Sequence, residues 1–462
     1  MARLVIVSNR LPDVSDPSSP RAGGLAAGLA DALVPGSLWF GWSGRRVPAR
    51  TEEIRSMEAD GVTYATIDLA EDDYRAYYLG FSNGTLWPLF HMMPGFLTFD
   101  LAGYAAYKVV NEEFAKGLLK LLRPDDLIWI HDYQLLGVAA SLRRLGVGNR
   151  IGFFLHIPFP APALFDLLPP GDELLMGLLA HDVVGFQTAQ DQGHFLAALQ
   201  ARGIPVQGGD VLHGGRLVRS VVTPIGVDVE GFSRLATRAA RRVEARRVVE
   251  SLAGRALMIS ADRLDYTKGL PARFDAYRRF LSLYPAQRRR ISFLQIAAPS
   301  REEVEKYKSL RDELDYKAGA INGEYSDFDW VPLRYMTRVV GRGLIAGLFW
   351  ISRIGLVTPL RDGMNLVAME YVAAQNPENP GVLIISRFAG AAALLPEALQ
   401  VNPYDVDKVA EAINTALTMT LEERQERHTA LLACVRRHDA GAYSRSFVAA
   451  LNQGALDGPR PG

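Results

Sequence analysis

The sequence predicts an α/β protein built from two doubly wound, Rossmann-like domains that face each other across a cleft. Two observations predict this class. Short apolar runs alternate with helical patterns along the whole chain, and most of these runs are continuously apolar rather than alternating. Such runs are typical of parallel strands that helices cover on both faces. A length of 462 residues suits two or three domains of roughly 150 residues each.

The apolar runs predict eight strands in chain order. They are Leu4–Ser8, Leu127–Ile130, Ile151–His156, Asp182–Phe186, Ala256–Ser260, Ile291–Ile296, Ile354–Thr358 and Val382–Ser386. Helical periodicity between them is clearest over Phe99–Leu122, Gln134–Leu145 and Leu270–Tyr284. Right-handed βαβ connections are therefore expected in each half of the chain.

The domain boundary is expected between residues 230 and 255. Val222–Val227 ends one series of strands and helices, a long arginine-rich helix is predicted over Val229–Leu252, and a new strand opens at Ala256. We therefore expect an N-terminal domain over residues 1–235 and a C-terminal domain over residues 236–439. Ligands of open α/β sheets bind beyond the carboxyl ends of the strands, so functional residues are sought there.

The composition excludes several classes of protein. Lys+Arg and Asp+Glu both number 51, and this balance argues against a general nucleic-acid binder. The longest apolar stretch, Leu344–Ile351, is far shorter than the roughly 20 residues that cross a bilayer, so no membrane partner is expected. The single cysteine, Cys434, excludes an intrachain disulfide and favours a cytoplasmic location. The histidines form no metal-ligand motif, so no metal is expected.

The first candidate segment is LVIVSNRLPDVSDPSSPRAGGLAAGL, a strand, a loop and a helix. Arg10 follows the strand, and Gly23 and Gly24 precede the helix. Paired glycines let a phosphate or sugar approach the free backbone N–H groups at a helix amino end. The alternative is an ordinary loop closed by glycine.

The second segment, ISADRLDYTKGL, places two cations beyond a strand. Arg263 and Lys268 lie five positions apart, and two such cations suit a diphosphate. The alternative is local neutralisation by Asp262 and Asp265. Lys268 lacks the glycine pattern of a Walker loop, so nucleotide hydrolysis is not indicated.

The third segment, VTPLRDGMNLVAMEYVAA, is the most informative. A strand ends at Thr358, residues 361–365 form a tight loop, and a helix continues through Glu370. The helix start offers backbone donors to a phosphate, and Glu370 follows at about 7.5 Å, the reach from a phosphate to a ribose diol. The alternative makes Asp362 a helix cap and Glu370 a solvated residue.

Five further residues are weaker candidates, each with a structural alternative. His156 ends a predicted strand, where a lone histidine is more often structural. Asp132 resembles a helix cap, and Arg301 could pair with the acidic helix start that follows it. Tyr78 and Trp87 are core aromatics by default.

The ordered motifs together resemble the trehalose-6-phosphate synthases, the retaining GT-B glucosyltransferases of glycosyltransferase family 20. The resemblance covers nearly the whole chain. Its motifs are SNR, AGGL, LWFGWSG, FSN, LWP, IWIHDYQLL, RIGFFLHIPFP, GFQT, PIGVD, RLDYTKGLPARF, APSREEV, INGEYSDFDW, GLVTPLRDGMNLVAMEY, NPGVLIISRFAGAA and VNPYD. It implies UDP-glucose as donor, glucose 6-phosphate as acceptor, and trehalose 6-phosphate and UDP as products.

The resemblance also implies roles for individual residues. The implied donor set is Gly23, Gly24, His156, Arg263, Lys268, Val340, Asp362, Gly363, Met364, Asn365, Leu366, Val367 and Glu370. The implied acceptor set is Arg10, Tyr78, Trp87, Asp132 and Arg301, with Arg10 and Arg301 as phosphate clamps. The implied catalytic set is His156, Asp132, Arg263, Lys268 and Asp362. A closing helix at about residues 440–456 is implied to pack on the N-terminal domain.

The residues leave some alternatives open. Met369 stands where the family usually has lysine, and Ala393-Leu394 stand where it commonly has Asn-Glu. These departures bear on donor-nucleotide preference and loop closure. The rival functions are a synthase using GDP-glucose or glycerol 3-phosphate, or an inactive sugar-phosphate sensor. Small-molecule substrates are the expected partners, no cofactor is expected, and homo-oligomerisation is left open.

Overall fold

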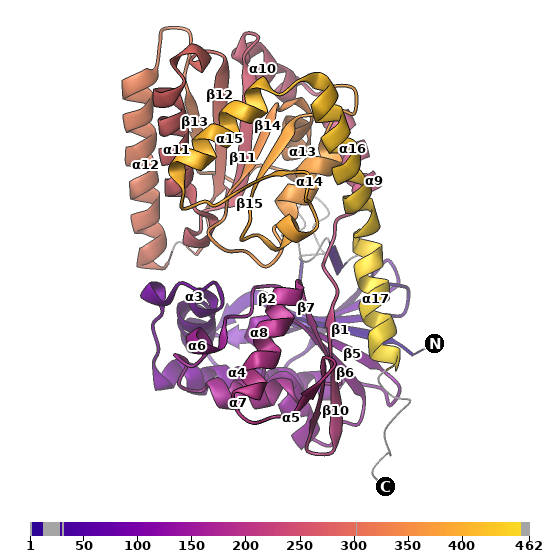
Figure 1. Cartoon of the computed structure of the whole chain (residues 1–462). Coiled ribbons are helices and arrows are strands. Elements are labelled where there is room, and N and C mark those ends of the chain that lie inside the picture. Colours follow the sequence, from indigo (N-terminus) through magenta and orange to yellow (C-terminus); the bar gives the residue numbers. More distant parts are fainter. Residues whose placement is uncertain (1, 13–27, 30–31, 302, 454–462) are drawn as a thin grey trace. The chain divides into compact units, whose positions relative to one another are not determined.

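The computed structural model describes residues 2–12, 28–29, 32–301 and 303–453. The chain divides into two compact units, one formed by Met1–Ile225 with Ala440–Gly462 and the other by Gly226–Asp439. Each unit is built around one sheet with helices packed on it, which confirms the predicted α/β class (Figure 1).

Ten strands form the sheet of the first unit. They are β1 (Leu4–Arg10), β2 (Leu38–Val47), β3 (Arg55–Ala59), β4 (Val62–Ala70), β5 (Leu127–His131), β6 (Arg150–Phe154), β7 (Val183–Phe186), β8 (Val206–Gln207), β9 (Asp210–His213) and β10 (Arg216–Val222). Their order is β3-β4-β2-β1-β5-β6-β7-β10-β9-β8. The inner strands are parallel, while β3, β8 and β9 pair antiparallel with their neighbours. The sheet order reverses between β1 and β5, the place where ligands bind in such folds.

The helices of the first unit include one long π-helix, η1. They are α2 (Glu71–Asp73), η1 (Tyr74–Leu86), α3 (Trp87–Phe90), η2 (Pro94–Phe96), α4 (Leu101–Leu119), η3 (Tyr133–Leu135), α5 (Val138–Arg144), α6 (Pro162–Phe165), α7 (Gly171–Leu178), α8 (Ala189–Gln200) and α17 (Ala440–Gln453). The i→i+5 bonds of a π-helix are rare in proteins and are frequently found at functional sites. This segment carries Tyr78 and directly precedes Trp87, and both are predicted site residues.

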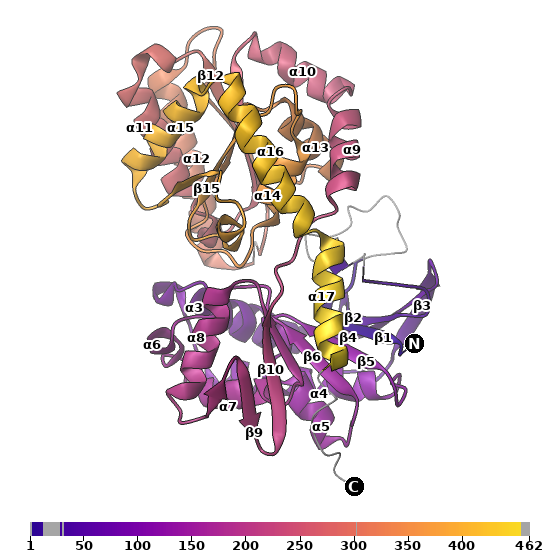
Figure 2. The same cartoon turned by 45° about the vertical axis from the view of Figure 1, so that its right-hand side comes forward.

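The carboxyl-terminal helix α17 packs on the first unit against β6 and β7 (Figure 2). The ring of Phe447 stacks on Trp129 with the ring centroids 4.6 Å apart. Glycines at 152 and 185 make room for this ring, because a Cβ at either position would lie 2.7 Å from it. The resemblance placed residues 440–456 here, of which 454–456 lie outside the described residues.

Six parallel strands form the sheet of the second unit. They are β11 (Ala256–Arg263), β12 (Ile291–Ala298), β13 (Leu333–Met336), β14 (Ile354–Val357), β15 (Val382–Ser386) and β16 (Leu399–Val401). Their order, β13-β12-β11-β14-β15-β16, is the 3-2-1-4-5-6 order of dinucleotide-binding sheets. The order reverses between β11 and β14, so the loops after these two strands are expected to hold the ligand.

Helices cover both faces of this second sheet. They are α9 (Val229–Ala239), α10 (Val243–Leu252), η4 (Tyr266–Lys268), α11 (Leu270–Leu283), η5 (Pro285–Gln287), α12 (Glu305–Tyr325), α13 (Arg342–Ile351), α14 (Leu366–Ala374), η6 (Gly390–Ala393), α15 (Val406–Thr418) and α16 (Leu421–Arg437). Figure 1 shows α11, α12 and α15 beside one face, and α9, α13 and α14 beside the other.

The domain boundary differs from the prediction. Residues 226–235, expected in the N-terminal domain, belong to the second unit because α9 packs on α13 and α14. The expected single helix over Val229–Leu252 is also wrong, since α9 ends at Ala239 and α10 starts at Val243. The chain enters the second unit at Gly226 and leaves it at Asp439. These two ends of the unit touch, because a Cβ at Gly226 would overlap the carbonyl oxygen of His438.

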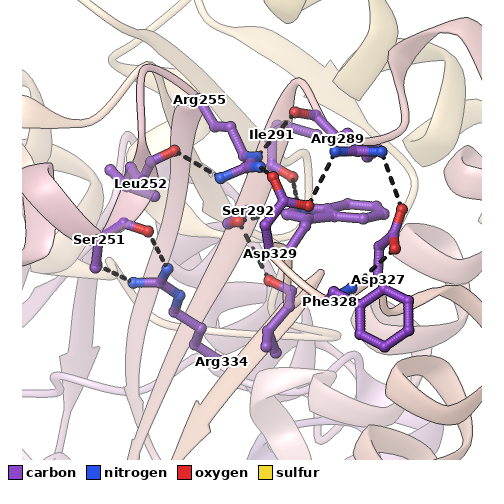
Figure 3. A network of polar contacts seen from close by, with 12 residues as sticks. Ser251, Leu252, Arg255, Arg289, Ile291, Ser292, Asp327, Phe328, Asp329 and Arg334 are labelled. Atoms are coloured by element: carbon purple, nitrogen blue, oxygen red, sulfur yellow. Dashed lines mark hydrogen bonds and ion pairs between the residues drawn. The ribbon is translucent and has the colours of Figure 1, made fainter.

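The amino edge of the second sheet is closed by a surface network of arginines and carboxylates (Figure 3). Arg289 binds Asp327 at 3.0 Å and Asp329 at 2.9 Å, and Arg255 binds Asp329 at 2.6 Å. Arg334 donates to the hydroxyl and the carbonyl of Ser251. These bonds join the segments that lead into β11, β12 and β13.

Candidate functional site

The loops after β11 and β14 meet at the carboxyl edge of the second sheet. The ammonium of Lys268 donates to Oδ2 of Asp362, and both side chains are largely buried. Asp362 also accepts a bond of 3.0 Å from Nδ2 of Asn365. Arg263 is exposed at the end of β11. Lys268 and Asp362 are 94 positions apart in the sequence. They meet because β11 and β14 lie beside each other in the sheet.

The loop after β14 presents the amino end of α14. Asn365 has a φ of 71°, a left-handed conformation, and precedes the first helical residues, Leu366-Val367. Gly363-Met364 are buried behind it. The helix cap predicted as the alternative for Asp362 is wrong, because Asn365 holds the cap position and α14 has no side-chain cap. The first-turn N–H groups of α14 are therefore not bound by a capping side chain, which suits an anion.

Glu370 lies on α14 and is paired with an arginine that the sequence analysis missed. Nη2 and Nε of Arg342 lie 2.9 and 3.2 Å from Oε1 of Glu370. Burial raises the pKa of the Glu370 carboxyl, and Arg342 opposes that rise. The alternative of a solvated Glu370 is wrong, since its side chain is 17% exposed. The partners lie 28 positions apart, so no local sequence signal indicated the pair.

Arg301 lies in a buried ion pair. Its Nη1 is 3.4 Å from Oδ2 of Asp265 and 2.6 Å from the hydroxyl of Tyr307. Burial alone would raise the pKa of Asp265, but the charges of Arg301, Arg263 and Lys268 outweigh it and lower that pKa. The predicted alternative, a pair between Arg301 and its own helix start, does not describe this contact. Asp265, in the loop after β11, is the acidic partner in this contact.

Arg273 was not predicted, and it is buried beneath the same loop. Its guanidinium contacts Ser260 and Asp262 on β11, Gln295 on β12 and Thr358 after β14 at 2.5–3.0 Å. It also donates to the carbonyl of Lys268 at 3.1 Å. Asp262 is therefore a partner of Arg273. The alternative of local neutralisation describes Asp265, whose pKa the charges of Arg263 and Lys268 help to lower.

The first unit gathers Arg10 and Tyr78 around one indole. The Arg10 guanidinium lies 5.7 Å from the ring centre of Trp42, and the Tyr78 ring lies 6.1 Å from it. The Arg10 side chain lies over Gly44, where a Cβ would come within 2.8 Å of Nε. Trp42 was missed as a site residue, although it stands in the quoted motif LWFGWSG.

Trp87 is the C-cap of the π-helix, and its backbone N–H donates to the carbonyl of Ser82, an i→i−5 bond. The indole is 5% exposed and lies against Tyr133 at 5.7 Å and His91 at 4.1 Å. The default interpretation, a core aromatic, describes its burial in this structure. Its implied role toward the acceptor stays a prediction.

Asp132 follows β5 in a strained conformation. Its φ of 76° is uncommon for a residue with a side chain, and such strain concentrates at functional sites. Oδ1 of Asp132 accepts a bond of 3.2 Å from the backbone N–H of His156, which follows β6. The Asp132 side chain makes no capping bond to η3, so it is not a side-chain helix cap.

The proton positions on His156 follow from its neighbours. The backbone N–H of Ile225 donates to Oε1 of Gln187, so the Gln187 amide nitrogen faces Nδ1 of His156 at 3.4 Å. Nδ1 must then accept, and Nε2 carries the proton toward Nδ1 of His131 at 3.0 Å. Burial lowers the pKa of His156 to about 3, so the ring is neutral. Gln187 and His131 are neighbours that the sequence analysis did not select.

The remaining predicted positions are quickly placed. Gly23 and Gly24 lie outside the described residues. Val340 is half-buried and directly precedes Gly341, which caps α13. Met369 is fully buried on α14, and Ala393-Leu394 lie at the end of η6.

The described residues include no grouped metal ligands and no membrane-spanning helix. Among the described residues, no three His, Cys, Asp or Glu side chains are grouped so as to hold a metal ion. No helix in the described part of the chain has the length and apolar character to cross a membrane.

Comparisons with known proteins agree over the full length. The model of glycosyltransferase family 20 matches residues 3–453. The trehalose-6-phosphate synthase of Sinorhizobium fredii is 44% identical over 457 residues, covering 97% of this chain and 98% of that protein. The UDP-forming α,α-trehalose-phosphate synthase of Burkholderia xenovorans, solved with glucose-6-phosphate, is 45% identical with a TM-score of 0.95, covering 98% and 100% of the two chains.

A structure from E. coli bound with UDP-2-fluoro glucose is also similar. It is 43% identical with a TM-score of 0.92 and covers 98% of this chain and 99% of its own. These matches identify both sheets as those of a GT-B enzyme. The chain belongs to glycosyltransferase family 20.

Proposed function

We propose that this enzyme transfers glucose from UDP-glucose to glucose 6-phosphate with retention of configuration, giving trehalose 6-phosphate and UDP. The observation that carries the proposal is the junction of β11 and β14, where the Lys268 ammonium and the amino end of α14 lie together. A cation and a helix amino end at a sheet switch point suit a diphosphate. The S. fredii, B. xenovorans and E. coli relatives support the choice of substrates.

The proposed roles follow the motifs. Arg263 and Lys268 bind the diphosphate, Glu370 binds the ribose hydroxyls, and backbone at Val340 and at Leu366-Val367 receives the uracil and phosphates. The donor glucose contacts Gly23, Gly24, His156, Asp362, Gly363, Met364 and Asn365. Arg10, Tyr78, Trp87, Asp132 and Arg301 bind glucose 6-phosphate, with the two arginines on its phosphate.

We propose a front-face displacement for the reaction. The bond from C1 of glucose to the UDP oxygen breaks, and the acceptor hydroxyl oxygen bonds to C1 on the same face. The hydroxyl proton passes to the departing phosphate oxygen. Arg263, Lys268 and the α14 amides stabilise the charge that develops on the diphosphate. Because the protein supplies this charge, we propose that the reaction needs no metal. We also propose a cytoplasmic location, which the single cysteine favours.

Product analysis tests the proposal. Wild-type enzyme is given UDP-glucose or GDP-glucose with glucose 6-phosphate, glycerol 3-phosphate or glucose, and products are identified by NMR. We expect α,α-linked trehalose 6-phosphate from UDP-glucose and glucose 6-phosphate, with activity unchanged by EDTA. Faster turnover of glycerol 3-phosphate or GDP-glucose would favour the rival synthases. Ligand binding without any turnover would favour a sensor.

A further inference from the structure

The contact between Arg342 and Glu370 has an unusual geometry. An arginine fork commonly places one N–H on each oxygen of a carboxylate. Here both Nε and Nη2 of Arg342 point to Oε1, at 3.2 and 2.9 Å. Oε2 of Glu370 receives no hydrogen bond from any described residue. One oxygen is therefore held by the protein, and the other can accept a hydrogen bond from a ligand.

The Arg342 side chain is held by the packing of its helix. Its guanidinium lies 4.9 Å from the ring centre of Phe232 on α9. Helices α9 and α13 approach closely at Gly347, where a Cβ would lie 2.8 Å from the backbone of Ala239. The close approach fixes where α13 begins, and Arg342 is its first residue. The contact of the two helices therefore places Arg342 beside Phe232, and its side chain, 48% exposed, reaches Glu370 from there.

Arg342 affects the protonation of Glu370 through its charge, in addition to holding the carboxylate in place. Burial raises the pKa of this carboxyl, and Arg342 is the charged group that lowers it. An ionised carboxylate accepts hydrogen bonds at both oxygens, whereas a protonated one loses part of that capacity. Without Arg342 the carboxyl would be easier to protonate.

We infer that Arg342 is a positioning residue for the ribose of the donor: it holds Glu370 through Oε1 and leaves Oε2 to accept from a ribose hydroxyl. The inference rests on the proposed function, in which Glu370 binds those hydroxyls. Arg342 also follows Val340, the proposed uracil contact, by two residues. It thereby links the loop that receives the base to the carboxylate that receives the sugar.

Calorimetric binding of UDP, 2′-deoxy-UDP and 3′-deoxy-UDP tests the inference. Wild type, Arg342→Met, Glu370→Gln and the double variant are compared. Wild type should bind UDP about tenfold or more tightly than at least one deoxy nucleotide, as expected for a hydrogen bond to a charged group. Arg342→Met should reduce this preference to about threefold or less. The double variant should bind UDP no more weakly than Glu370→Gln alone, because both changes remove the same interaction.

A pH series separates positioning from general damage. In Arg342→Met we expect the pKa of Glu370 to rise further. As pH decreases, UDP affinity should therefore begin to fall at a higher pH in this variant than in wild type. Arg342→Lys keeps the charge and should restore the wild-type profile in part. The matched control is Arg338→Met, which changes an exposed arginine in the loop before α13 and should alter neither property.

Two outcomes would overturn the inference. Equal weakening of UDP and both deoxy nucleotides in Arg342→Met would show a structural role only. Unchanged affinity for all three nucleotides in that variant would remove Arg342 from ribose recognition. Wild-type turnover of UDP-glucose with glucose 6-phosphate is measured in parallel, so a failure of the proposed function is recognised separately.

Discussion

The two edges of the second unit's sheet carry the same kinds of ion pair in different surroundings. At the amino edge, Arg289 binds Asp327 and Asp329, whose side chains are 41% and 57% exposed (Figure 3). At the carboxyl edge, the pairs of Arg273 with Asp262 and of Arg301 with Asp265 have side chains at most 6% exposed.

The ion pairs at the amino edge are therefore exposed at the surface, whereas those at the carboxyl edge are buried beside the proposed site. Exposed ion pairs contribute about 0–1 kcal/mol each, whereas burying a charged pair carries a desolvation cost that apolar packing would avoid. Buried charges concentrated where the diphosphate is proposed to bind are therefore consistent with a functional requirement. Substitutions at both edges of the sheet test that contrast.

Arg273→Met should cause the largest loss of stability. Removing one partner of a buried pair costs about 3–5 kcal/mol, because Asp262 and several other acceptors lose their donor. Scanning calorimetry of the full chain should show the second unit unfolding at lower temperature. Combining the change with Asp262→Asn should recover part of the loss, and an equal loss in both variants would contradict the assignment.

Arg301→Ala should reduce the reaction with the phosphorylated acceptor more than the other changes do. We expect kcat/KM for glucose 6-phosphate to fall roughly 30- to 1000-fold, equivalent to about 2–4 kcal/mol of transition-state stabilisation. The kcat/KM for glucose should fall little, and UDP affinity should be almost unchanged. Asp265 also loses its partner, so thermal unfolding is recorded alongside, with Arg301→Lys as the variant that keeps the charge. Equal losses for both acceptors would move Arg301 out of the phosphate site.

Lys268→Ala should lower kcat rather than acceptor affinity. The lost contact is worth about 1.5–3 kcal/mol, roughly 10- to 150-fold, and it strengthens as charge develops on the diphosphate. Arg263→Ala should behave alike. Lys317→Ala removes an ammonium that pairs with Asp275 at 2.6 Å on the helical surface, and it should leave kcat intact. A normal kcat in both site variants would refute the roles proposed for the cations.

Acid should destabilise the protein through histidines at either edge of the first sheet. Burial lowers the pKa of His181, at the amino edge, and of His156, at the carboxyl edge, to about 3. The unfolded chain therefore binds protons below about pH 6.5 that the native chain does not, so stability falls with decreasing pH. For the fully buried His181 the loss by pH 5 is about 2 kcal/mol.

Denaturation at several pH values measures this effect. His181→Gln should flatten the dependence between pH 6.5 and 5, whereas a change at the exposed His213 should not. An unchanged slope in His181→Gln would show that its burial does not control protonation.

Arg289→Ala should have the smallest effect. Its two pairs are exposed, so we expect a loss below about 1 kcal/mol that salt reduces, with kcat and KM unchanged. Urea unfolding at low and high salt, together with an activity assay, measures both. A substantial loss of activity would mean that the amino edge also serves the reaction.

The sequence alone predicted the class of fold and the ends of the strands that matter. Continuous apolar runs marked the buried parallel strands, including β11 and β14, and placed Lys268 and Asp362 each beyond one of them. The ordered motifs added the family. Strands such as β2 and β4 were not predicted from apolar runs, because polar and apolar residues mix along them.

Only the tertiary structure decided which of these residues meet. Lys268 reaches Asp362 because β11 and β14 pair, and Arg342 reaches Glu370 because α13 and α14 lie side by side. The left-handed backbone of Asp132 and the buried guanidinium of Arg273 likewise depend on contacts distant in sequence. Hydrophobic periodicity is a local property and reports burial, whereas the partner of a buried charge is determined by which strands and helices pack together.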